Sequence, residues 1–90
     1  MTSLELYKVL LRNPDTQLIV AIEELAELQK ELTKTLRGKS NISNLLEEVA
    51  DVEIMLEQIK LLFGFKEEDI NIKKEQKLKR VEQRLKQKIL

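Results

Sequence analysis

The 90-residue chain contains neither cysteine nor histidine. Without cysteine it has no disulfides and no thiolate metal sites, as in proteins of the reducing cytosol. Without histidine, catalysis must use carboxylates, lysines or a metal-bound water, and an all-helical phosphodiesterase of the His-Asp type is excluded. The N-terminus shows no signal-peptide pattern, and no apolar run approaches the ~20 residues of a membrane span. We therefore expect a soluble, cytoplasmic protein without a membrane partner.

Aromatic residues and net charge are also scarce. One tyrosine and two phenylalanines are the only aromatics, so Tyr7 and Phe65 are weak candidates for stacking against a nucleotide base. Charged residues make up 36% of the chain, but 16 basic and 16 acidic residues cancel. Nucleic-acid-binding domains usually carry a basic excess, so we expect no nucleic-acid partner. Ninety residues form at most one small domain, residues 1–90.

The periodicity predicts an all-α chain, because no segment alternates polar and apolar residues as a strand does. Helices are expected over about 3–12, 14–37, 42–63 and from about 67 to the C-terminal lysines and arginines. Ser3 and Asn41 are candidate N-caps, and Pro14 fits the first turn of the second helix. Gly38 and Gly64 are natural residues to end the second and third helices.

The second helix carries an apolar arc with an acidic patch beside it. The arc comprises Leu18, Ala21, Ile22, Leu25, Leu28, Leu32 and Leu36, and it predicts the buried face. Glu24, Glu27 and Glu31 form the patch. An acidic patch on a single helix is usually a solvated face, and that interpretation remains open for these three residues.

The third helix breaks its own apolar pattern. Its arc comprises Leu45, Val49, Val52, Met55, Leu56, Ile59, Leu62 and Phe63. Glu48 projects from inside this arc, and Asp51 lies at its margin. An ionised carboxylate on a core-facing stripe is costly unless it is paired or binds a metal. One alternative is that Glu48 forms a salt bridge with a lysine or arginine. Another is that the buried face of this helix is narrower than the arc and leaves Glu48 outside it. An acid that interrupts an apolar pattern is, however, expected at a functional site.

Four acids, Glu24, Glu27, Glu48 and Asp51, form two pairs whose members are three residues apart. Such residues lie on nearly one helix face, so antiparallel packing of the two helices would bring the pairs together around a cation. Ligation by oxygen alone favours Mg²⁺, with Mn²⁺ as a substitute. The corresponding chemistry is metal-assisted attack of water on a phosphate ester or anhydride, with a spare carboxylate as general base.

These residues resemble a known signature. Glu24-x-x-Glu27, a helix-turn-helix and Glu48-x-x-Asp51 are similar to the ExxE…ExxD signature of the MazG-like, all-α nucleoside triphosphate pyrophosphohydrolases. The resemblance extends from about Gln17 through Gly64, and the stretches QLIVAIEELAELQKEL and NLLEEVADVEIMLEQI correspond to the two central helices of that family. The terminal KLKRVEQRL also resembles the tail of its short members.

The resemblance implies an antiparallel helical bundle with two long central helices, completed by association into a homodimer or homotetramer. It implies Mg²⁺-dependent hydrolysis of nucleoside triphosphates, (d)NTPs, between the α and β phosphates, in many members as nucleotide-pool house-cleaning. Glu24, Glu27, Glu48 and Asp51 would then be the metal ligands and the catalytic residues.

Basic residues supply candidates for binding the triphosphate. Lys77, Arg80 and Arg84 lie beside or near the apolar stripe of the last helix, and Lys30 lies beside the acidic patch. The alternative is that these side chains cover the bundle with their alkyl stems or pair with nearby acids.

Apolar residues off the main arcs indicate self-association, because small domains with such a surplus generally form symmetric oligomers. Two classes of function remain: the pyrophosphohydrolase, and a non-enzymatic helical oligomer acting in assembly. A catalytically degenerate, nucleotide-binding relative of the enzyme is a further variant.

Overall fold

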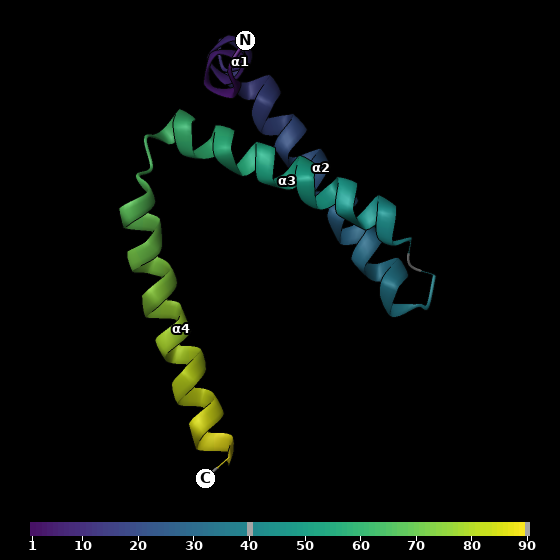
Figure 1. Ribbon diagram of the computed structural model, residues 1–90, viewed down its shortest axis with the longest axis vertical. Helices are drawn as coiled ribbons and strands as arrows, with labels where there is room; N and C mark the ends of the chain where they lie inside the picture. Colours follow the sequence, from purple (N-terminus) through teal and green to yellow (C-terminus); the bar gives the residue numbers. More distant parts are fainter. Residues whose placement is uncertain (40, 90) are drawn as a thin grey trace.

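A computed structural model describes residues 1–39 and 41–89 (Figure 1). The helices are α1 (Ser3–Leu10), α2 (Pro14–Leu36), α3 (Ile42–Phe63) and α4 (Glu67–Ile89). No strand occurs within the described ranges, which confirms the all-α prediction. Among these helices, none has both the length and the apolar character needed to cross a membrane.

The helix ends follow local chemistry. Thr2, rather than Ser3, caps α1, because its Oγ1 accepts a hydrogen bond from the Glu5 amide at 3.1 Å. Asn41 Oδ1 accepts one from the Asn44 amide at 3.1 Å and so caps α3 as predicted. Gly64 ends α3 in the left-handed region, at φ 68°, where a side chain would be strained.

Helices α2 and α3 form an antiparallel hairpin, and they are the two helices that pack together along their length (Figure 1). On α2 the buried or half-buried residues include Gln17, Ala21, Glu24, Leu28 and Glu31. Their spacing alternates between four and three, so they form one row along the helix, the contact row. Ala21, Val52 and Met55 are the only buried apolar residues among those that the structure describes, so the hairpin core is small.

The prediction that the apolar arc of α2 is the buried face is wrong for four of its seven members. Ile22, Leu25, Leu32 and Leu36 are exposed. The reason is that α3 packs on the contact row, which lies about 100° around α2 from the row of exposed leucines. The interior of the hairpin is therefore partly acidic, and much of its apolar surface faces outward.

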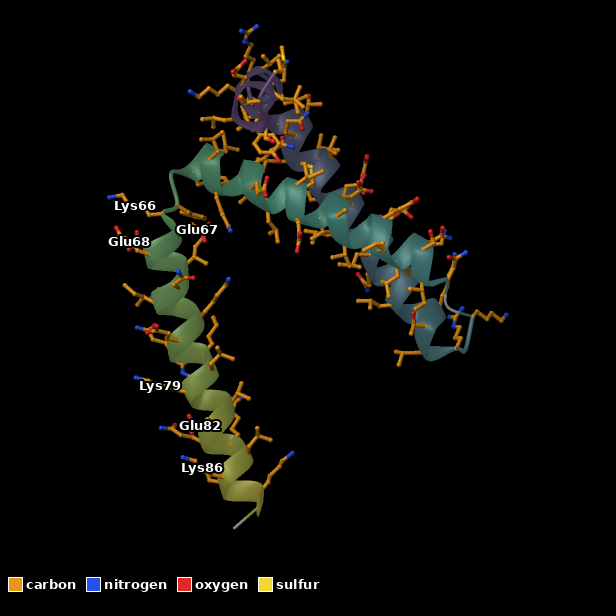
Figure 2. All side chains as sticks on the ribbon, viewed as in Figure 1. Lys66, Glu67, Glu68, Lys79, Glu82 and Lys86 are labelled. Atoms are coloured by element: carbon orange, nitrogen blue, oxygen red, sulfur yellow. The ribbon has the colours of Figure 1, made fainter. Side chains whose placement is uncertain are left out.

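Helix α4 leaves the hairpin and extends away from it (Figure 1). Its first residue, Glu67, pairs with Lys60 of α3 at 2.7 Å. Beyond that point Ile70 is half-buried, and every other side chain described from Glu67 to Lys88 is exposed. Figure 2 shows Lys79 and Lys86 pointing away from the hairpin. The radius of gyration is 16.8 Å, compared with about 12 Å for a compact domain of this length.

Replacing Asn41 tests whether its side chain caps α3. We expect Asn41→Ala to lower the free energy of unfolding by about 1 kcal/mol, because an orphan amide at the helix start loses its acceptor. Urea denaturation followed by circular dichroism measures the loss. Ser43→Ala, in the same turn at an exposed position, is the control. Equal losses in the two variants would contradict a capping role for Asn41.

Candidate metal centre

Three carboxylates from two helices meet at the hairpin interface. Glu24 comes from the contact row of α2, and Glu48 and Asp51 come from α3, where they are three residues apart. One oxygen from each carboxylate lies within 4.8 Å of the other two, and all three residues are half-buried. The structure thus brings together three of the four acids singled out in the sequence, and this group is the carboxylate cluster.

Burial and repulsion by neighbouring carboxylates make ionisation of Glu24 and Glu48 unfavourable. Desolvation is the main reason that the pKa of Glu24 is raised above its ordinary value, followed by the charges of Asp51 and Glu48. The pKa of Glu48 is raised for the same reasons, first by desolvation and then by Asp51, Glu27 and Glu31. Such a cluster is stabilised by taking up protons or by binding a cation.

Glu48 also has an oxygen without a partner. Its Oε2 is buried and accepts no hydrogen bond from the described residues. The salt-bridge interpretation fails here: in the part of the chain that the structure covers, the ion pairs are Lys34–Glu31, Lys60–Glu67 and Lys86–Glu82. A buried carboxylate oxygen without a donor is costly. Carboxylate oxygens are ligands that hard cations prefer, so Glu24, Glu48 and Asp51 could hold a metal ion.

Glu27 and Glu31 lie near this cluster but outside it. Glu27 is exposed, although its charge contributes to the raised pKa of Glu48. Its role as a metal ligand stays a prediction. Glu31 is only 7% exposed, and its Oε1 lies 3.3 Å from Lys34 Nζ. The sequence did not single it out as part of the site. The available signal was its position seven residues after Glu24, on the contact row.

The predicted phosphate-binding residues are not gathered around the cluster. Lys30 is exposed on α2, while Lys77, Arg80 and Arg84 lie on α4, which extends away from the hairpin (Figure 1). A single chain in this arrangement therefore does not bring the basic residues of α4 to the carboxylates. Their part in binding a triphosphate stays a prediction.

The two candidate stacking residues border a separate hollow. Tyr7 and Phe65 line an open depression of about 540 Å³ between α1, the end of α3 and the start of α4. The Tyr7 hydroxyl donates a hydrogen bond to Glu57, and this bond is the main reason that the pKa of Tyr7 is raised. None of the three cluster carboxylates lines this depression.

Comparison with protein-family models, curated proteins and solved structures gives no match to this chain. The resemblance to MazG-like enzymes thus depends on the motif residues alone. What the site can do follows from its own chemistry, that of half-buried carboxylates with one unpartnered oxygen.

Neutralising Glu48 tests whether repulsion between the three carboxylates destabilises the folded protein. We expect Glu48→Gln to raise Tm at pH 7 in the presence of EDTA, because it removes repulsion within the cluster. A raised native-state pKa means that the folded protein holds more protons than the unfolded chain. Stability therefore falls as pH rises from about 4.3, the ordinary value for glutamate, through the raised pKa values. This fall should be smaller in the variant.

Thermal unfolding between pH 4 and 8 measures both effects, with Glu53→Gln as the control, since Glu53 is exposed on the same helix. A Glu48→Gln protein less stable than wild type without metal, or with an unchanged pH dependence, would show that Glu48 is not under electrostatic strain.

Proposed function

We propose that the protein is a Mg²⁺-dependent nucleoside triphosphate pyrophosphohydrolase, which converts a (d)NTP to the monophosphate and pyrophosphate. The observation that carries the proposal is the buried, unpartnered Oε2 of Glu48 beside Glu24 and Asp51. The sequence places these residues in a motif like that of the MazG-like family, and the donor set suits a hard divalent cation.

In this proposal, Glu24, Glu48 and Asp51 hold the metal through carboxylate oxygens. The bound ion would neutralise phosphate charge and lower the pKa of the attacking water. Glu27 is the acid best suited to accept a proton from that water, since it is exposed to solvent and its charge reaches Glu48. It serves as general base, or as a fourth ligand if it turns inward. Glu31 is paired with Lys34, and its negative charge also acts on Glu48.

Substrate binding needs positive charge that the cluster itself lacks. Lys30, Lys77, Arg80 and Arg84 are the candidates for contacting the phosphates. For the three on α4, this requires α4 to approach the hairpin of its own chain or that of another copy in a homodimer or homotetramer. Nucleotide-pool house-cleaning is the corresponding cellular role.

A second function is favoured by one observation, the large apolar surface that the chain exposes. Such a surface suits a non-enzymatic helical oligomer that serves assembly, with the carboxylates unused or binding metal or nucleotide without turnover. Catalysis separates the two proposals, because an assembly protein releases no pyrophosphate.

Incubation with a mixture of (d)NTPs and Mg²⁺ should release pyrophosphate and not orthophosphate. We expect Glu48→Gln to lower kcat/KM more than about 100-fold, since even residues that only hydrogen-bond to metal ligands contribute about 10–100-fold. Glu53→Gln should retain full activity. Release that is independent of Mg²⁺, or equal in Glu48→Gln and wild type, would contradict the proposed site.

Metal binding is measured separately by thermal unfolding. At ten times its dissociation constant, Mg²⁺ should stabilise the wild-type protein by about 1.4 kcal/mol, which raises Tm by about 5–10 °C for a domain of this size. The Glu48→Gln protein should show no such rise. Mg²⁺-dependent stabilisation without pyrophosphate release would favour a degenerate, metal-binding relative. The absence of both responses would favour the assembly protein.

A further inference from the structure

The first turn of α4 is already in contact with the end of α3. Lys60 of α3 and Glu67 of α4 form an ion pair at 2.7 Å, and the hydrogen bond from Lys60 holds the pKa of Glu67 below its ordinary value. Ile70, three residues further along, is half-buried, while residues 71–88 are exposed. The contact between the two helices thus begins at their junction and ends after about one turn.

The junction that joins α3 to α4 is short and lies outside both helices. Gly64 ends α3 in the left-handed region, at φ 68°, and Phe65 and Lys66 belong to neither helix. Antiparallel helix pairs are joined by loops of about two to five residues, so these three residues are enough for α4 to fold back along α3. Such a hinge needs changes in only a few backbone angles.

α3 carries a row of exposed side chains on the side turned away from α2. The row follows heptad spacing, in alternating steps of four and three residues, and we call it the outer row. It comprises Ile42, Leu46, Val49, Glu53, Leu56 and Lys60. Lys60 is half-buried and the other five are exposed, Ile42 and Leu46 at 69% each. This is the spacing with which one helix packs along another.

α4 carries a row with the same steps when both rows are counted away from the junction. This α4 row comprises Ile70, Lys74, Lys77, Val81, Arg84 and Lys88, and Leu85 lies at its edge. When antiparallel helices are joined by a turn centred on Phe65, residues equally distant from Phe65 face each other. The two rows then match at every position, from Lys60 opposite Ile70 to Ile42 opposite Lys88.

The facing positions are chemically complementary. In this register Val49 would lie against Val81, and Glu53 would lie against Lys77. The other apolar residues of the outer row would lie against lysine or arginine side chains, whose alkyl stems can cover apolar surface. No two like charges face each other, and the facing acid and base favour this register over its neighbours.

We propose that α4 closes onto the outer row of its own α3, so that the hairpin and α4 form an antiparallel three-helix bundle. The exposed area supports closure. The chain exposes 7606 Å², whereas a compact monomer of its mass, 10.6 kDa, exposes about 5,500 Å². Packing α4 along α3 would bury part of this excess. No carboxylate of the cluster belongs to either row, so the inference does not depend on the proposed enzymatic activity.

The structure favours α4 of the same chain, rather than a helix of another molecule, as the occupant of the outer row. Closure continues a contact that the Lys60–Glu67 pair has already started. The short junction also keeps α4 at a high effective concentration beside α3, which a separate molecule lacks.

Spin labels on introduced cysteines test closure, because the chain has no cysteine of its own. Ser43→Cys and Gln87→Cys place labels at exposed positions near the far ends of α3 and α4, equally distant from Phe65. Closure brings the helix axes to about 8–10 Å from each other. Arms of about 33 Å each, set at a right angle, instead keep their ends about 47 Å apart.

Double electron–electron resonance measures which of these distances is populated, with circular dichroism to verify folding. We expect the short distance to dominate, also when the labelled chain is diluted in a large excess of unlabelled chain. Labels that stay at the long distance would overturn the proposal. So would a short distance that is lost on this dilution, since the helix on the outer row would then belong to a second copy.

A charge swap tests the register. Lys77→Glu sets two acids opposite each other, so it should lower the ratio of closed to open chains about fivefold, and adding Glu53→Lys should restore it. Lys79→Glu is the matched control, because Figure 2 shows Lys79 pointing away from the hairpin, and it should leave the ratio unchanged. Equal effects of Lys77→Glu and Lys79→Glu, or no restoration by Glu53→Lys, would refute the proposed facing of the two rows.

Discussion

The burial of Glu24, Glu48 and Asp51 between α2 and α3 is the constraint on which the rest of the structure depends. Each of these carboxylates would be better solvated on an outer helix face, and together they repel one another across less than 5 Å. Helix pairs normally place apolar residues at their contact. This hairpin instead places acids there, at a cost that a bound metal ion could offset.

The same constraint explains why so much apolar surface faces outward. The contact row of α2 includes Gln17, Glu24 and Glu31, and α3 contributes the buried Gln58. These polar residues occupy positions that leucines would otherwise fill, so the hairpin has few buried apolar side chains of its own. A core of that size is small for a domain of 90 residues. The apolar residues one position further along α2, such as Leu25 and Leu32, are exposed and add little to that core.

Much of the fold could be predicted from the sequence, because its determinants are local. Pro14, Asn41 and Gly64 set helix boundaries within a few residues, and the predicted range of α3 is the observed one. The unusual position of Glu48 could also be predicted, because this acid interrupts the apolar arc of its own helix. Its half-buried setting and unpartnered oxygen agree with that prediction. For Glu24, the sequence left open whether the acid was buried or solvated.

What could not be predicted was the rotation of α2 against α3. Two adjacent rows on α2 both follow heptad spacing: one is almost wholly apolar, and the other carries Glu24 and Glu31. Hydrophobicity alone selects the first row as the inner face, whereas the structure places the second against α3. The choice depends on residues of a different helix, so no pattern within a single helix contains it. Glu31 was missed for this reason, because it becomes part of the site only when its row faces inward.

Although the chain has no net charge, its acidic and basic residues are concentrated in different helices. Residues 14–63, which include the hairpin, carry ten acidic and five basic residues, whereas residues 70–89 carry two acidic and eight basic residues. The chain is thus an acidic hairpin joined to a basic helix that extends away from it (Figure 1). Carboxylates repel other anions, and eight of the 16 basic residues of the chain lie on α4. Attraction between oppositely charged surfaces acts over roughly 10 Å at moderate salt, so α4 can assist the cluster only after coming within that range of a hairpin.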